Sequence, residues 1–201
     1  MQPLFAHQPV LAAIMAISLL LWRVLEAGID IQSFRRLRAG AQRRDNGSKL
    51  VILVLFVAGF LLGTALAFRS PATAVTNASA RAVLFWLGIA LIYAGMLFRF
   101  YAIYTLGSYF TTTVAITPQQ TVVETGPYRL IRHPSYTGLL ILVFGYGLCL
   151  TNWLSLLILV GCVLIGLGYR IRVEERVLLE QLGQPYQEYM RHTKRLIPFV
   201  L

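Results

Sequence analysis

Charged residues are scarce in this chain, and acidic residues are the scarcest of them. Asp, Glu, Lys and Arg make up 13% of its 201 residues, about half of the roughly 25% that is typical of a soluble domain. Hydrophobic residues make up 57%, and they are concentrated in runs long enough to cross a bilayer. The composition therefore argues against an ordinary soluble domain and predicts one polytopic membrane domain.

Cysteine is rarer still. The chain has two, Cys149 and Cys162, and both lie inside apolar runs. This argues against a disulfide framework and a metal site, so we expect no bound metal. Internal repeats, flexible linkers and a Gly-rich phosphate loop are absent as well. The first nine residues lack Lys and Arg, and no small-residue cleavage site follows the first apolar run. We expect that run to be a retained helix.

Positive charge is what the chain has in excess, with 18 Lys and Arg against 8 Asp and Glu. Such a balance is typical of nucleic-acid-binding proteins, but here the basic residues lie in short loops between apolar runs, as the positive-inside rule predicts. We therefore expect membrane lipids, and no nucleic acid, as partners. The Arg-rich loop at residues 35–49 predicts a cytoplasmic side there and an N-terminus outside.

The apolar runs predict an all-α integral membrane protein with about five transmembrane helices. The expected spans are Val10–Ala27, Leu50–Phe68, Ala82–Leu106, Tyr136–Leu150 and Trp153–Gly168. Thr151 and Asn152 are the turn candidates between the last two runs, which are short and therefore predict a tight helical hairpin. The charged segment Tyr169–Leu182, followed by Gly183, predicts a separate C-terminal amphipathic helix on the cytoplasmic side.

Charged residues also occur within the expected spans. Arg23 and Glu26 are three residues apart, which is a spacing at which they can pair on one helical face. Arg99 lies in the second half of the third span. It is either a side chain that snorkels to the cytoplasmic interface or part of a binding site.

The most informative stretch is the polar, basic segment Gly126–Gly138, which directly precedes an apolar run. His133 and Pro134 predict the entry to a helix, because proline suits the first helical position. The unpaired N–H groups of that turn, with Arg129 and Arg132 nearby, predict a binding place for a small anionic group such as a carboxylate or phosphate.

A glutamate falls on the apolar side of the segment Tyr169–Leu182. Glu175 lies in the middle of an apolar stripe, and a carboxylate there needs a partner. It is either part of a functional site or a surface acid that pairs with Arg172 or Arg176. The aromatic and basic tail from Tyr186 onward is expected to lie in the headgroup layer.

In their order and spacing these motifs resemble the isoprenylcysteine carboxyl methyltransferase family, whose relatives include the phospholipid N-methyltransferases. The matching elements are Gly126-Pro-Tyr-Arg129, Arg132-His-Pro-Ser-Tyr-Thr-Gly138, Asn152, Arg170-Ile-Arg-Val-Glu-Glu175, Leu178, Gly183, Tyr186 and Tyr189. The resemblance implies a single membrane domain, residues 1–201, with its cofactor-binding core in residues 99–198. The helices in residues 1–80 carry no signature of the family.

The resemblance also implies methyl transfer from S-adenosylmethionine, which leaves S-adenosylhomocysteine, in a pocket that faces the cytoplasm. The cofactor contacts that it implies are Gln120, Val122, Val123, Gly126, Tyr128, Arg132, His133, Pro134, Tyr136, Gly138, Glu174 and Glu175. Many members have a histidine where this chain has Gln120, so an amide takes the place of an imidazole. The expected catalytic residues are Arg170, Glu174 and Arg99, with an arginine that steers an anionic acceptor.

The expected acceptor is the carboxylate of a lipophilic or prenylated, isoprenylcysteine-like compound. A carboxylate is already ionised at pH 7 and needs no general base, which agrees with the lack of an obvious nucleophile–base pair. A phospholipid or amine N-methyltransferase shares the same cofactor site. A nicotinamide-dependent membrane reductase and a non-enzymatic transporter or structural protein are further alternatives. We expect a multi-pass protein of the bacterial inner membrane.

Overall fold

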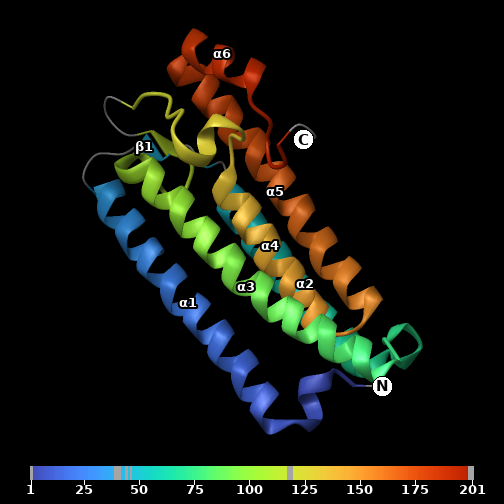
Figure 1. Ribbon diagram of the computed structural model, residues 1–201. Coiled ribbons are helices and arrows are strands. Elements are labelled where there is room, and N and C mark those ends of the chain that lie inside the picture. The colour runs from blue at the N-terminus through green and yellow to red at the C-terminus, as the bar shows by residue number, and fades with distance from the viewer. Residues whose placement is uncertain (1, 39–41, 44, 46, 117–119, 199–201) are drawn as a thin grey trace.

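The computed structural model describes residues 2–38, 42–43, 45, 47–116 and 120–198, and long helices that run side by side dominate it (Figure 1). The α-helices are α1 (Pro9–Arg38), α2 (Ser48–Arg69), α3 (Ala78–Leu106), α4 (Pro134–Cys149), α5 (Trp153–Leu182) and α6 (Gln184–His192). Short 3₁₀ helices are η1 (Leu4–His7), η2 (Pro71–Thr73), η3 (Gly107–Tyr109) and η4 (Gly126–Arg129). Two short strands, β1 (Gln42–Arg43) and β2 (Ala115–Ile116), pair antiparallel.

The all-α membrane architecture predicted from the apolar runs is confirmed. Within the described residues, four helical segments are long and apolar enough to cross a membrane, and α4 is a shorter apolar helix. The tight turn between α4 and α5 is also confirmed. Thr151 adopts a positive φ of 50° there, and the Asn152 side chain caps α5 by accepting a hydrogen bond from the Ser155 N–H.

Two helix boundaries differ from the prediction. The segment Tyr169–Leu182 is not a separate helix but the second half of α5, because no glycine or proline interrupts it before Gly183, which has a φ of 61°. Helix α1 likewise continues past Ala27 to Arg38. Residues 35–38 and 48–49, at the two ends of the Arg-rich loop, are therefore helical, and Arg44 of that loop lies outside the described residues.

Glycines allow α3 and α4 to pack closely as an antiparallel pair. A Cβ added to Gly95 would lie 2.6 Å from the Gly138 carbonyl oxygen, and one added to Gly145 would lie 2.6 Å from that of Gly88. Contacts this short are possible only where the facing residues lack side chains, as is common between membrane helices. Helices α2 and α5 form a second close pair, in which Gly59 faces Cys162.

The shortness of α4 leaves a recess at one end of the bundle. Its 16 residues extend about 24 Å, whereas the 30 residues of α5 extend about 45 Å. Helix α5 therefore extends past the start of α4. Helix α3 runs antiparallel to α4, and its C-terminal end extends past the same point. The connector between α3 and α4 and the helix α6 lie over this end (Figure 1), so the start of α4 is enclosed.

We expect Gly145→Ala to lower the free energy of unfolding by roughly 1–3 kcal/mol, because its methyl group is forced against α3. Gly161→Ala, within α5, is the matched control, since no atom lies within 4 Å of its added methyl group. Thermal unfolding of the detergent-solubilised protein measures both. Equal midpoints for the two variants would contradict the proposed role of the α3–α4 contact.

Candidate functional site

A cavity of about 390 Å³ lies at the start of α4, within the usual size range of small-molecule sites. Its polar lining comes from the connector, the first turn of α4, the second half of α5 and α6, and also from α1, α2 and α3, which contribute Glu26, Lys49 and Arg99. Its apolar wall includes Trp22 of α1 and Phe56 of α2, whose ring centroids are 5.4 Å apart, together with Ile52, Leu53 and Leu139. The cavity thus offers a polar and an apolar surface within one space.

The structure brings most of the residues singled out from the sequence to this cavity. Those that line it are Arg99, Gln120, Val122, Val123, Tyr128, Arg132, His133, Tyr136, Arg170 and Glu174. Gly126, Pro134, Gly138 and Glu175 are not among the lining residues. Gly138 contacts the backbone of α3, where its added Cβ would lie 2.7 Å from the Arg99 N, and Pro134 is the first residue of α4.

The predicted helix entry at His133 and Pro134 is confirmed, but the chain itself covers it. The N–H groups of Arg132 and His133 donate to the carbonyl oxygens of Lys194 and Arg195, at 2.7 and 3.0 Å. Carbonyl oxygens of the C-terminal tail therefore take the place that the sequence suggested for a small anion. Of these two N–H groups, that of the N-cap residue His133 is one of the unpaired donors of the helix start, and that of Arg132 lies before it.

Glu175 of α5 binds both the C-terminal tail and Arg132, which lies just before α4. Its Oε1 accepts a hydrogen bond from Arg132 Nε at 2.8 Å, and its Oε2 accepts two from Arg195 at 2.9 and 3.0 Å. The alternative in which Glu175 pairs with Arg172 or Arg176 is therefore wrong. The partners come from residues 132 and 195, which are distant in the sequence, so helical spacing could not reveal them.

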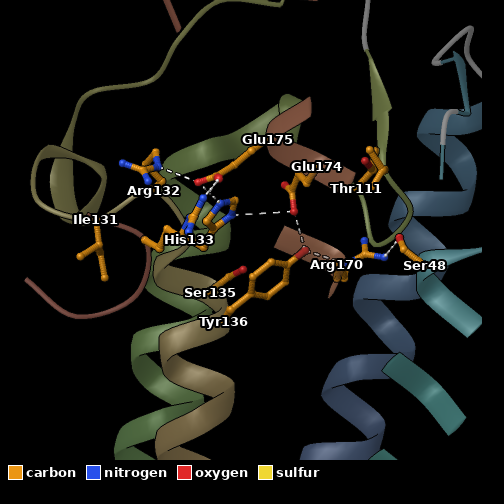
Figure 2. Close-up of polar contacts among 12 residues, drawn as sticks. Ser48, Thr111, Ile131, Arg132, His133, Ser135, Tyr136, Arg170, Glu174 and Glu175 are labelled. Atoms are coloured by element: carbon orange, nitrogen blue, oxygen red, sulfur yellow. Dashed lines mark hydrogen bonds and ion pairs between the residues drawn. The ribbon is translucent and has the colours of Figure 1, made fainter. Parts of the chain in front are cut away.

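The neighbouring Glu174 points instead to the cavity, and Figure 2 shows the two glutamates on different sides of His133. His133 is buried and stacks on the Tyr136 ring, with centroids 5.4 Å apart. Its Nδ1 lies 3.8 Å from Glu174 Oε2 and its Nε2 lies 3.5 Å from Glu175 Oε1. The Nε2 atom is buried against Glu175, whereas Nδ1 faces Glu174, which lines the cavity.

A chain of hydrogen bonds runs from Glu174 away from the cavity. The Tyr136 hydroxyl donates to Glu174 Oε2 at 2.7 Å and accepts from Arg170 Nε at 2.7 Å. Arg170 is buried, and its other donors reach Asp45 Oδ1 at 3.1 Å and the Thr112 carbonyl oxygen at 2.7 Å. With a further hydrogen bond from Nη1 to Ser48 Oγ, Arg170 uses four of its five N–H donors within the protein.

Asp45 was not among the residues singled out from the sequence, although it is an acidic residue in an otherwise basic loop. Its side chain is 1% exposed and accepts hydrogen bonds from the Lys49 N–H, the Ser48 hydroxyl and the Val114 N–H. Burial alone raises the pKa of this carboxyl. The three hydrogen bonds and the charge of Arg170 outweigh burial, so its pKa lies below the usual aspartate value.

Arg99 does not extend to the membrane interface, and it is Arg99 rather than Arg23 that pairs with Glu26. It forms a bidentate ion pair with Glu26, at 2.6 and 3.0 Å, and its Nη1 donates to the Ser135 carbonyl oxygen at 3.0 Å. The pairing of Arg23 with Glu26 that their spacing suggested is therefore wrong. Packing of α1 near α3 brings Arg99 to Glu26, and a buried guanidinium requires a carboxylate more than an exposed one does.

The tail contributes more to the cavity than its composition suggested. Tyr186 and Tyr189 of α6 are buried and line the cavity, and the Tyr189 hydroxyl donates to the Tyr128 carbonyl oxygen at 2.7 Å. The expectation that these aromatic residues lie in the headgroup layer is wrong for both. Burial raises the pKa of Tyr128 and of Tyr186. Both phenols are therefore neutral near pH 7 and serve as hydrogen-bonding aromatic walls.

Comparison with known proteins matches residues 86–180 to the isoprenylcysteine carboxyl methyltransferase (ICMT) family. A relative from Oryza sativa subsp. indica, "Probable protein-S-isoprenylcysteine O-methyltransferase", is 32% identical over 117 residues, which cover 57% of this chain and 61% of the relative. The Saccharomyces cerevisiae "Protein-S-isoprenylcysteine O-methyltransferase" is 36% identical over 116 residues, which cover 57% of this chain and 48% of the relative. The match with this chain thus spans 61% and 48% of the length of these two relatives.

A solved structure titled as the eukaryotic intramembrane Ras methyltransferase ICMT has a similar fold. Its TM-score is 0.56 and its identity 27%, over 74% of this chain and 52% of that chain. The resemblance inferred from the motifs is confirmed, as is the helical membrane fold. With four apolar helices of spanning length, this chain is an integral membrane protein.

We expect the contribution of Asp45 to stability to be complete at neutral pH and to be lost in acid. Because its folded-state pKa lies below the unfolded value of about 3.9, the contribution is present above that value and disappears as the pH falls through the folded-state pKa. Thermal midpoints in detergent between pH 7 and pH 3 measure this. In Asp45→Asn the midpoint should be lower at pH 7, and the difference from wild type should shrink in acid. A difference that is constant with pH would contradict the assignment.

Proposed function

Because residues 86–180 match the isoprenylcysteine carboxyl methyltransferase family, we propose that the chain transfers a methyl group from S-adenosylmethionine to a lipophilic, isoprenylcysteine-like carboxylate. The observation that carries this proposal is the composition of the cavity. Residues of the family motif line it together with apolar side chains of α1 and α2, among them Trp22, Ile52 and Phe56. A polar cofactor and a lipophilic acceptor need these two surfaces side by side.

The polar end fits the cofactor. S-adenosylmethionine, when bound, supplies a methyl group on a positively charged sulfur. Glu174 lines this end, its side chain is 28% exposed, and it forms no ion pair with a Lys or Arg in the described part of the chain. It can therefore face a cation or accept hydrogen bonds from ribose. His133, which lines the cavity with its Nδ1 3.8 Å from Glu174 Oε2, is a second group suited to a polar ligand.

Aromatic and connector residues complete this end. Tyr128, Tyr186 and Tyr189 supply flat aromatic surfaces, which suit an adenine ring. Gln120, Val122 and Val123 of the connector line the same cavity. Because the connector and α6 lie over the recess, we propose that they close the cofactor off from water.

The acceptor binds on the opposite side, between α1 and α2. Trp22, Ile52 and Phe56 offer an apolar surface for its lipid tail. Arg99 uses three of its N–H donors on Glu26 and Ser135, and a guanidinium has five. The remaining donors make Arg99 the better of the two expected arginines to orient an acceptor carboxylate. Arg170 instead supports Tyr136 and Glu174.

The reaction then depends on positioning. Opposite charges on acceptor and donor neutralise each other as the methyl group moves, so a site with little water favours transfer. The residues of the cavity hold the two reactants in line, which is the main contribution that such a reaction needs. No side chain has to remove a proton, because the acceptor carboxylate is ionised near pH 7.

We also propose that residues 1–201 form one domain whose cavity faces the cytoplasm, in a bacterial inner membrane. The basic end of α1, with Arg35, Arg36 and Arg38, lies at the cavity end of the bundle (Figure 1). Positive charge at that end favours the cytoplasmic side. Glu26 and Asp45 come from the first 80 residues and pair with Arg99 and Arg170, which supports treating the chain as one unit.

Methylation of an amine is the second candidate. A protonated amine has to lose its proton before it can accept a methyl group, and His133 lines the cavity with an imidazole, a group that can take up a proton. The two candidates share the cofactor end and differ in the acceptor. A reductase or a non-enzymatic protein is not favoured by the family match.

We expect the purified protein to bind S-adenosylhomocysteine, and Glu174→Gln to weaken this binding about tenfold, as the loss of a charged hydrogen-bond acceptor predicts. Isothermal titration in detergent measures the affinity. Glu188→Gln is the matched control, because Glu188 is an exposed residue of α6 that contacts Gln184. If Glu174→Gln binds as tightly as Glu188→Gln, Glu174 is not a cofactor ligand.

For the acceptor, we expect membranes that contain the protein to transfer tritium from labelled S-adenosylmethionine to a lipid-soluble product. Mild base should release the label as methanol, because a methyl ester is hydrolysed and an N-methyl group is not. A label that resists base would favour the amine acceptor instead. Membranes without the protein provide the background.

A further inference from the structure

We propose that Asp45 is a positioning residue of the active site, whose carboxylate fixes the orientation of Arg170 and, through Tyr136, the position of Glu174 at the cavity. This inference rests on the proposed function, because it assigns Glu174 to the cofactor. Asp45 lies outside residues 86–180, the part of the chain that matches the family. Its role therefore cannot be transferred from the matched motif.

The first support is the geometry of the carboxylate. Oδ1 lies 2.9 Å from Ser48 Oγ, 3.2 Å from the Val114 N and 3.1 Å from Arg170 Nη1, and Oδ2 lies 3.0 Å from the Lys49 N. The donors come from the start of α2, the connector and α5. A carboxylate held by three separate segments has one possible position, so its position defines where the Arg170 guanidinium lies.

The second support is the direction of the hydrogen bonds beyond Arg170. A guanidinium only donates, so the Tyr136 oxygen must accept from Arg170 Nε. The single Tyr136 proton is then directed to Glu174 Oε2. Arg170 therefore determines that the Tyr136 hydroxyl donates its proton to Glu174. This hydrogen bond holds the Glu174 carboxylate at the cavity wall (Figure 2).

Loss of the Asp45 charge should disturb this arrangement in a specific way. Arg170 is buried, and a buried guanidinium without a carboxylate is strongly unfavourable. The nearest acid on its other side is Glu174, from which the Tyr136 hydroxyl now separates it. Arg170 would turn toward Glu174 and pair with it, so the carboxylate proposed for the cofactor would be neutralised by the protein itself.

A double-mutant cycle tests this, with S-adenosylhomocysteine as the probe and isothermal titration on the full chain in detergent. Asp45→Asn and Tyr136→Phe should each weaken binding about tenfold, the size of one lost charged hydrogen bond. Because both act on the same chain of contacts, the double variant should bind no more than about tenfold more weakly than wild type. Independent, additive losses of about a hundredfold would overturn the proposal, and so would wild-type affinity in Asp45→Asn.

Ser48→Ala provides a milder variant if Asp45→Asn does not fold. Ser48 Oγ donates to Asp45 Oδ1 and accepts from Arg170 Nη1 at 3.2 Å, so its removal loosens the same contact and leaves both charges. We expect about threefold weaker binding, with no further loss when it is combined with Tyr136→Phe. Additive losses here would also overturn the role of Asp45.

The wild-type protein and Glu188→Gln separate the two levels of inference. If neither binds S-adenosylhomocysteine, the proposed function fails, and the role of Asp45 fails with it. If both bind and Asp45→Asn binds equally well, the proposed function stands and the positioning role alone is wrong.

Discussion

Buried arginines need carboxylates, and this requirement organises the cavity end of the protein. Arg99, Arg132 and Arg170 have side chains that are at most 9% exposed, and each forms an ion pair with an acid from a distant segment, Glu26, Glu175 and Asp45 respectively. A guanidinium in such a place is costly unless it is paired and hydrogen-bonded. The three pairs therefore join α1 to α3, the connector to α5, and the loop before α2 to α5, around one space.

The membrane sets the other constraint, which is length. A short α4 between the longer α3 and α5 places polar residues at the bottom of a recess rather than on the surface of the bundle. Glycines such as Gly95 and Gly138 bring α3 and α4 so close that Arg99 of α3 reaches the Ser135 carbonyl oxygen of α4. The same packing that holds the bundle together thus positions the arginine at the cavity.

Adjacent residues of one helix have separate tasks at this site. Glu175 faces Arg132 and Arg195 and holds the tail over the start of α4, whereas Glu174 faces the cavity through Tyr136. Since successive helical residues point about 100° apart, a pair of acids can serve the structure with one side chain and the ligand with the other. The stability of the tail and the chemistry of the cavity are therefore linked at one turn of α5.

The sequence by itself determined the class of protein, the number of apolar helices, the helix start at Pro134 and the turn at Thr151 and Asn152. These follow from local rules, namely the length of apolar runs, the fixed φ of proline and the capping of helices. It could also identify ten of the cavity residues, because the motifs resemble those of the isoprenylcysteine carboxyl methyltransferase family in order and spacing. The tertiary structure alone decided the charge partners. Helical spacing suggested Arg23 as the partner of Glu26 and Arg172 or Arg176 as the partner of Glu175. The actual partners are buried arginines 73 and 43 residues away.

The role of Asp45 was also visible only in the tertiary structure. The sequence shows a lone acid in a basic loop, but it does not show which helix that acid contacts. Ion pairs form where burial makes an unpaired charge most costly, and burial is a property of the folded chain.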